Sequence, residues 1–256
     1  MLRDARRQAV RTALVGDGVT GDLWLSLIAL DVRHSRTRPA LIDPQVRYRI
    51  VLDGFPGATC RQQAGVLYLY TASTSGQPPR LLVQSTTKPD WSFLPTRHGA
   101  SISQVQDIGP FWDRIRAGSL YRFWLTACPS RAVGGHGGNR IRGTRTAIGD
   151  PSEQIDWLTR RLDGAATLTH VQVACPTKTT ARRGVHAVTL TSATFSGSLT
   201  VVDPTLLRQH VVTGIGPNKA YGHGLLIMRP ASPTVTVSRH RMSSDAAAHA
   251  RSDERV

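Results

Sequence analysis

The stretch DPTLLRQHVVTGIGPNKAYGHGLLIMR, from Asp203 to Arg229, predicts a helix, a glycine-rich loop and a strand in direct succession. Asp203 is a favourable N-cap, and Pro204 is tolerated at the first helical position because the N–H that proline lacks would be unpaired there. The apolar run from Leu225 to Arg229 has the length of a strand. This order of elements is the closing half of a split βαβ unit.

The same Asp-Pro start occurs earlier at Asp43-Pro44 and at Asp150-Pro151, where Glu153 is placed for a capping-box bond. These starts predict the main helices. Strands are expected over residues 22–31, 65–73, 80–86, 119–128, 167–175, 186–195 and 225–229, with a turn at 196–198 before a further short strand. The second half thus has the order strand, helix, strand, strand, helix, strand, and the first half begins in the same way. We predict an α+β fold of two tandem ferredoxin-like domains, each RRM-like with the order βαββαβ.

The domain boundary is expected in the irregular, proline-containing segment TKPDWSFLPTRHGA. It divides the chain into a first domain over residues 22–95 and a second domain over 96–231. Residues 1–21 are expected to be an N-terminal extension, and a short helix, a disordered arm and an untranslated stretch all stay open. Residues 232–256 are polar and rich in Ala, Ser and Arg, which predicts a disordered tail.

The charge of the chain indicates a polyanionic partner. Lys and Arg number 32 against 17 Asp and Glu, for a formal net charge of +15. Nucleic acid is the commonest intracellular polyanion, and no amphipathic helix with an aromatic edge favours a membrane surface. The three cysteines are widely spaced and form no CxxC motif. They predict reduced core cysteines in a cytoplasmic protein, with no zinc site, and we expect no metal and no cofactor.

The glycine-rich loop has two interpretations. Glycines let backbone N–H groups approach an anion, so Gly214, Gly216 and Gly222 are candidates for phosphate contact, and Lys219 adds a positive charge. Alternatively, the loop is a tight helix-to-strand connection with a solvated lysine. A dinucleotide-binding fingerprint is excluded, because Lys219 stands where the third glycine is required and a strand follows.

Other segments resemble those of a known family. They are DLWLSLIALD, LLVQSTTKPDWSFL, FWLTACPSRAV, EQIDWLTRRL and GSLTVVDP. Together with GIGPNKAYGHGLL, and in this order from Leu23 to about Pro230, they resemble the CRISPR-associated CasE family, the CRISPR RNA endoribonuclease of type I-E systems. The resemblance covers nearly the whole chain apart from its two ends.

The resemblance implies two tandem ferredoxin-like domains and a role in antiviral defence. It implies binding of the CRISPR repeat stem-loop and metal-independent cleavage at the base of the stem. The 2′-hydroxyl of the RNA attacks the adjacent phosphate, leaving a 2′,3′-cyclic phosphate and a 5′-hydroxyl. The enzyme then stays on the product as a subunit of the Cascade complex, so the other Cascade subunits are expected partners.

Three basic stretches are candidates for contact with the RNA. The first is the stretch PSRAVGGHGGNRIRGTR, which supplies Arg131, Arg140, Arg142 and Arg145. The resemblance implies that this stretch is a basic hairpin that reaches into the RNA stem. The second is Arg160 and Arg161, which could equally complement the dipole at a helix end. The third is Lys178, Arg182 and Arg183, which could equally be a solvated hairpin tip.

The resemblance also points to a catalytic helix, in which this chain departs from the family. The segment DPQVRYR has Gln45 where a tyrosine is expected and Tyr48 where the general acid–base histidine is expected, whereas Arg49 matches. A phenol is mostly protonated at pH 7 and is a poor base. Three interpretations stay open: Tyr48 donates a proton or orients the 2′-hydroxyl, His34 or His223 substitutes, or the chain is a hairpin-binding subunit with weak or no cleavage.

A more distant alternative is a generic RRM-like RNA binder. Such a protein stacks RNA bases on aromatic side chains of its central strands. The residues that could serve are Tyr68, Tyr70, Tyr121 and Trp124.

Overall fold

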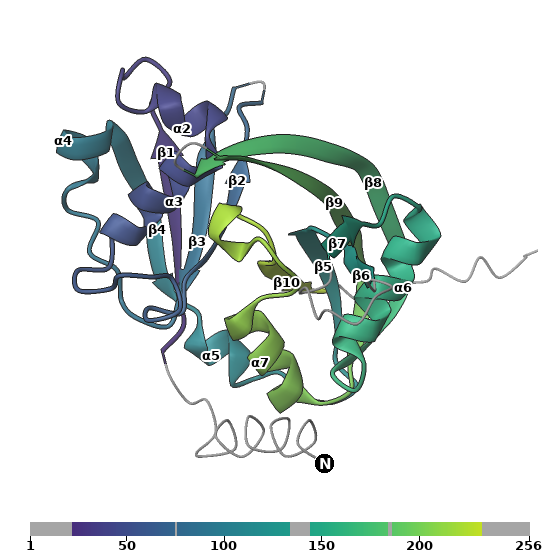
Figure 1. Cartoon of the computed structure of the whole chain (residues 1–256). Helices are drawn as coiled ribbons and strands as arrows, with labels where there is room; N and C mark the ends of the chain where they lie inside the picture. Colours follow the sequence, from purple (N-terminus) through teal and green to yellow (C-terminus); the bar gives the residue numbers. More distant parts are fainter. Residues whose placement is uncertain (1–21, 75, 134–143, 184–185, 232–256) are drawn as a thin grey trace, which may run out of the picture.

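The computed structural model describes residues 22–74, 76–133, 144–183 and 186–231 (Figure 1). The first sheet has the order β2-β3-β1-β4, and the second has the order β10-β5-β9-β8. The first contains β1 (Trp24–Leu30), β2 (Leu67–Thr71), β3 (Arg80–Ser85) and β4 (Ala100–Asp107). The second contains β5 (Leu120–Ala127), β8 (Ala166–Arg183), β9 (His186–Val201) and β10 (Leu226–Pro230). Neighbouring strands are antiparallel in both sheets.

Both sheets repeat one topology. When the strands are numbered within each domain, both sheets have the spatial order 4-1-3-2, which is the strand order of a ferredoxin-like fold. The helices of the first domain are α2 (Arg38–Ile42), α3 (Pro44–Asp53) and α4 (Leu94–His98). The second domain has α6 (Pro151–Leu162) and α7 (Pro204–Thr213), and α5 (Gly109–Trp112) joins the two domains. The predicted α+β class with two ferredoxin-like units is confirmed.

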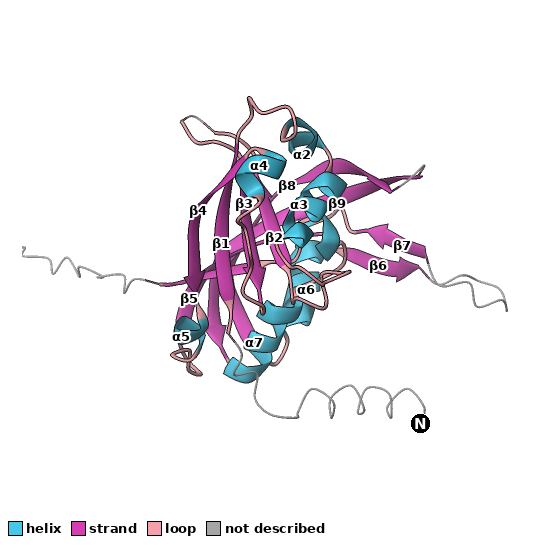
Figure 2. Ribbon diagram, turned by 90° about the vertical axis from the view of Figure 1, so that its left-hand side faces the viewer, coloured by secondary structure: helices cyan, strands magenta, loops and turns pink. Residues whose placement is uncertain are grey.

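The three Asp-Pro helix starts are confirmed with their caps. Asp43 accepts the N–H of Gln45 at 2.8 Å at the start of α3. Asp150 caps α6 and Asp203 caps α7, each accepting two backbone N–H groups of the first turn. The side chain of Glu153, expected to form a capping box, reaches Arg131 at 3.2 Å. Figure 2 shows α3, α6 and α7 on one side of the sheets, and the hairpin of β6 (Ser130–Val133) and β7 (Thr144–Ala147) projects from that side.

The first domain extends beyond the expected boundary at residue 95. Residues 100–107 form β4, which pairs with β1 along its whole length, so they complete the first sheet. The boundary was expected within the irregular, proline-containing segment before them, which forms α4 near its end. As an edge strand paired on one side only, β4 needs fewer buried side chains than a central strand.

The turn expected at 196–198 is wrong. These residues lie inside β9, which runs unbroken beside β8 over 16 residues. A Cβ on Gly197 would lie 3.0 Å from the carbonyl oxygen of His170. Gly197 is therefore required by close packing against the neighbouring strand, as glycines inside strands often are. The long β8–β9 hairpin reaches across to α3 of the first domain (Figure 1).

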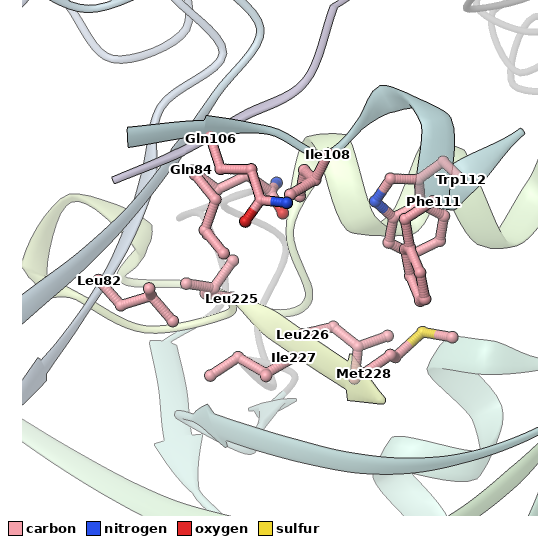
Figure 3. Close-up of a pocket in the computed structure, with 11 residues that line it drawn as sticks. Leu82, Gln84, Gln106, Ile108, Phe111, Trp112, Leu225, Leu226, Ile227 and Met228 are labelled. Atoms are coloured by element: carbon pink, nitrogen blue, oxygen red, sulfur yellow. The ribbon is translucent and has the colours of Figure 1, made fainter. Parts of the chain in front are cut away.

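The two domains have separate cores, and they meet through a few specific contacts. Phe123, Phe195 and Trp157 belong to the second core, and Tyr68 and Trp91 to the first. Between the domains, the side chain of buried Gln84 donates to the carbonyl of Val211 at 2.9 Å. An apolar pocket of about 250 Å³ lies beside this contact (Figure 3). It is lined mainly by Leu25, Leu82, Ile108, Phe111, Trp112 and residues 225–228.

Candidate functional site

A basic pocket of about 330 Å³ lies where the ends of α6 and α7 meet the glycine-rich loop. Its charged lining side chains come from β7, α6, α7 and the short helix η1 (Lys219–Tyr221): they are Arg145, Arg160, Arg161, His210 and Lys219. The loop residues 214–217 complete the wall. No carboxylate is among the described residues that line the pocket. Four formal cations thus surround a concave space with no neutralising partner in its wall.

The electrostatics of the pocket show this repulsion. Burial lowers the pKa of Lys219, and the nearby charges of Arg61 and Arg161 lower it further. The pKa of His210 is also lowered, first by burial and then by Arg161 and Lys219. Like charges disfavour each other's ionised forms, and an anion between them reverses the effect. The charges of the pocket therefore favour binding of an anion.

The glycines of the loop are required by packing between the domains. Gly214 has φ +76°, and a Cβ there would lie 2.7 Å from a methyl carbon of Leu67 on β2. Gly222 has φ +86°, and its Cβ would lie 2.9 Å from the ring of Tyr68. Both positions need the left-handed conformation that glycine adopts without strain.

The backbone N–H groups of Gly214 and Gly222 are already used inside the loop. They donate to the carbonyls of His210 and Lys219. In this conformation these two N–H groups are therefore engaged inside the loop, and their contact with a phosphate stays a prediction. Gly216 and Lys219 line the basic pocket, so they are the loop residues placed to contact an anion there. The loop is at once a tight connection and a wall of the basic pocket.

The loop also holds the predicted catalytic helix in place. The hydroxyl of Tyr68 lies 3.1 Å from the carbonyl of Pro44, at the start of α3, and 3.1 Å from that of Ala220, in η1. Tyr68 is 1% exposed, and burial raises the pKa of its phenol, so it stays neutral. This buried hydroxyl therefore links the first turn of α3 to the glycine-rich loop.

Tyr48 lies on α3, half-buried against the first core. Its hydroxyl accepts the backbone N–H of Arg61 at 3.3 Å. Arg61 belongs to the loop after α3, and its charge acts on both Tyr48 and Lys219. Arg61 thus connects the predicted catalytic tyrosine electrostatically with the basic pocket. Gln45 is half-buried and Arg49 exposed on the same helix.

Arg47 on α3 supports the helix from inside. It is 5% exposed, and its guanidinium donates to the carbonyl of Ala40 at 2.9 Å. It also lies 4.1 Å from the ring centroid of Tyr70, a cation–π contact. Burial lowers the pKa of Arg47, and the charge is compensated by these carbonyl and aromatic partners.

The structure brings only part of the predicted RNA-binding set together. Arg145, Arg160, Arg161 and Lys219 line the pocket. Arg131 lies on β6, 62% exposed, and pairs with Glu153. Lys178 is exposed on β8. Arg140 and Arg142, and the side chains of Arg182 and Arg183, lie outside the described residues.

The two alternative histidines have structural surroundings of their own. His223 is 7% exposed, and burial lowers its pKa to about 4, so it is neutral at pH 7 and closed to solvent. His34 packs on Gly99, and its Nδ1 accepts the backbone N–H of Arg36 at 3.2 Å. Neither side chain lines the basic pocket.

The aromatic side chains proposed for base stacking are largely covered. Tyr68 and Tyr121 are buried in the two cores. Arg47 covers the ring of Tyr70, and the guanidinium of Arg229 lies 4.8 Å from the ring centroid of Trp124. An exposed stacking surface of the RRM kind is therefore not formed by these four residues.

Sequence reasoning missed two residues of the site, Arg61 and His210. Arg61 stands in a loop without a recognisable motif, so no signal marked it. His210 precedes Gly214 by one helical turn, and this spacing could have placed it beside the loop. Among the described residues, no three His, Cys, Asp or Glu side chains gather as metal ligands, and no described helix has the length and hydrophobicity of a membrane span.

Comparisons with known proteins assign the family. A family model described as CRISPR associated protein matches residues 23–230. The CRISPR-associated endoribonuclease Cse3 of Thermus thermophilus is 30% identical over 221 residues, which cover 81% of this chain and 100% of the relative. A structure of T. thermophilus Cse3 bound to an RNA representing a pre-cleavage complex is similar, with a TM-score of 0.71 and 29% identity over 82% of this chain and 100% of that one. A chain of a CRISPR RNA-guided surveillance complex shares the fold, with a TM-score of 0.63 and 23% identity over 81% and 100%. The chain therefore belongs to the CRISPR-associated Cse3 family, the CasE family that its sequence segments resemble.

Proposed function

We propose that this protein is a cytoplasmic, metal-independent endoribonuclease that binds the stem-loop of a CRISPR repeat and cleaves it to release mature CRISPR RNA. It then stays on its product as a subunit of a Cascade complex. The observation that carries the proposal is the basic pocket, which is joined through Arg61 and the glycine-rich loop to Tyr48 on α3. The similar Cse3 of T. thermophilus is an endoribonuclease by name.

The binding surface combines the pocket with the exposed basic residues around it. Lys and Arg neutralise backbone phosphates, and this contact is independent of base sequence. The β6–β7 hairpin projects from the same side as α3, α6 and α7 (Figure 2), so one face of the molecule offers Arg131, Arg145, Arg160 and Arg161. A duplex stem recognised by shape and backbone fits such a face.

The chemistry follows from the substrate itself. The 2′-hydroxyl oxygen attacks the adjacent phosphorus and loses its proton to solvent water, while the bond from phosphorus to the 5′-oxygen breaks. Tyr48 donates a proton to the departing 5′-oxygen, and Lys219 and Arg61 stabilise the added negative charge of the phosphorane. The products are a 2′,3′-cyclic phosphate and a 5′-hydroxyl.

A second candidate function is hairpin binding with weak or no cleavage. It is favoured by the state of Tyr48, whose hydroxyl already accepts an N–H and whose ring packs half-buried on the first core. A phenol held in this way must turn outward to reach a phosphate. The same binding face serves both candidates, so they differ only in the fate of the RNA.

The test is incubation of a repeat-length RNA hairpin with the protein in excess EDTA, with the termini of the products identified. The proposal predicts a cyclic phosphate end and no cleavage when the nucleotide before the scissile phosphate is 2′-deoxy. Tyr48→Phe should slow cleavage about 100-fold, the size of a typical proton-transfer contribution, with little change in RNA affinity. Tyr121→Phe, in the second core, is the matched control.

Each result separates the candidates. Tight hairpin binding without any cleavage by the wild type establishes the binding subunit, and Tyr48→His then tests whether a histidine at this place restores the reaction. Cleavage by Tyr48→Phe at the wild-type rate removes Tyr48 from proton transfer. If the protein shows no preference for the hairpin over an unstructured RNA, both candidates are wrong.

A further inference from the structure

His210 is a titratable group that the proposed mechanism does not use, although it lines the basic pocket. It lies in the last turn of α7, and its carbonyl accepts the N–H of Gly214 at 2.8 Å. Arg161 on α6 and Lys219 on η1 act on it electrostatically, and Arg160 on α6 and Arg145 on β7 line the same pocket. These neighbours are all cations.

Such surroundings disfavour the protonated form of His210 while the pocket is empty. The pKa of His210 lies below its ordinary value because of burial, then Arg161, then Lys219. A bound anion reverses the balance, because an opposite charge within hydrogen-bond reach raises the pKa of an imidazole by about one to three units. The imidazolium then offers two N–H donors in place of one.

We propose that the basic pocket binds one backbone phosphate of the RNA, and that His210 takes up a proton when the phosphate enters. This inference rests on the proposed function, because it names the RNA contact that depends on protons. Lys219, Arg145, Arg160 and Arg161 supply permanent attraction, and His210 adds a fifth positive charge when it is protonated in the bound state. RNA affinity therefore rises as the pH falls through the neutral range.

Phosphate could reach the pocket from RNA or from free phosphate in solution. The cationic walls can attract both, because both present negatively charged phosphate oxygens. The RNA stem differs in that it also contacts the exposed cations outside the pocket, such as Arg131 and Lys178. We therefore assign the pocket to RNA phosphate and make free phosphate an arm of the test.

The experiment measures hairpin affinity by fluorescence anisotropy between about pH 8 and about pH 6 at constant ionic strength, where an ordinary histidine titrates. The full chain, His210→Gln and the control His98→Gln, a histidine paired with Asp53 outside the pocket, are compared. When the pH is lowered, the hairpin affinity of the wild type and of His98→Gln should increase about tenfold more than that of His210→Gln. Calorimetry in two buffers of different ionisation enthalpy should show about one proton taken up per hairpin by wild type.

A second readout needs no variant. The imidazole signals of the wild-type protein are titrated by NMR alone, with inorganic phosphate and with the hairpin. The proposal expects one histidine signal to titrate at a higher pH with the hairpin than without it, whereas the signal of buried His223, whose pKa is also lowered, stays unchanged. If inorganic phosphate moves it and the hairpin does not, the RNA assignment is overturned.

The failure of this inference differs from the failure of the proposed function. Tight hairpin binding with no proton uptake, and with the same pH response in wild type and His210→Gln, overturns the role of His210 and leaves RNA binding intact. Absence of hairpin binding at any pH overturns both. The proposal is supported if His210→Gln still binds the hairpin but takes up no proton, whereas wild type and His98→Gln do take one up.

Discussion

Replacing Gly222 by alanine tests whether the packing between the domains positions the RNA-binding loop. Gly222 has φ +86°, and the new Cβ would lie 2.9 Å from Cε2 of Tyr68. The ring of Tyr68 belongs to the buried first core and cannot move freely. The loop must therefore shift away from β2, and the contact between the Tyr68 hydroxyl and Ala220 is lost with it.

The expected cost has two parts. A non-glycine residue in the left-handed region loses about 1–2 kcal/mol. Overpacking a buried ring adds about 1–3 kcal/mol. We expect a total near 3 kcal/mol, which lowers the melting temperature by about 6–12 °C for a chain of this size. The displaced η1 also carries Lys219 out of the basic pocket, so RNA affinity should fall together with stability.

Gly57 supplies a matched control. It has the same φ of +86°, but a Cβ there meets nothing within 4 Å. Gly57→Ala should cost only the backbone part, about 1–2 kcal/mol, and leave RNA affinity unchanged. Melting curves and hairpin titrations of both variants at a temperature where both are folded give the comparison. Equal melting temperatures and equal RNA affinities for the two variants would refute the reasoning that the Tyr68 contact holds the loop.

Other expected outcomes follow from the pocket and from the buried histidine. Lys219→Gln should reduce the slope of log affinity for the hairpin against log salt concentration by about 0.9, which corresponds to the loss of one phosphate contact. The control Arg114→Gln, on the α5 side, should leave this slope unchanged. Equal slopes for both variants would place Lys219 outside the RNA interface. His223 binds a proton less readily in the folded state, with a pKa of about 4 against 6.5, so unfolding is favoured as the pH falls between these values. The wild type should lose up to about 3 kcal/mol of unfolding free energy over this range in chemical denaturation, and His223→Gln should lose less. The same loss in both proteins would mean that His223 is already solvated.

The elements with strong local signals could be predicted from sequence. Asp43, Asp150 and Asp203 each precede a proline and cap a helix, because capping is decided by two or three neighbouring residues. The order of strands and helices then limited the topology to a ferredoxin-like fold. The glycine-rich loop was also found, and Lys219, predicted to add a positive charge there, lines the basic pocket.

Features that depend on distant partners could not be predicted in the same way. Gly197 resembles a turn residue locally, yet it is set by the strand that packs beside it. Strand β4 has only a short apolar pattern, Ala100 and Ile102, and its place in the first sheet is set by pairing with β1. Arg61 enters the site only after the two domains meet, since its neighbour Lys219 lies far along the chain in the second domain. His210 comes beside Arg161 only when α6 and α7 pack within the second domain.

The glycine-rich loop joins stability and RNA binding in one set of contacts. Tyr68 fixes the loop to the start of α3 through a single buried hydroxyl, and Gly222 allows the approach. Three residues before Gly222, Lys219 closes the basic pocket, so the distance between Tyr48 and the pocket is set by the domain interface. Movement of one domain against the other would separate Tyr48, the proposed proton donor, from the cations that we propose to stabilise the phosphorane. A chain whose binding is intact but whose cleavage is lost on loosening this interface would show that the interface aligns the reaction as well as the fold.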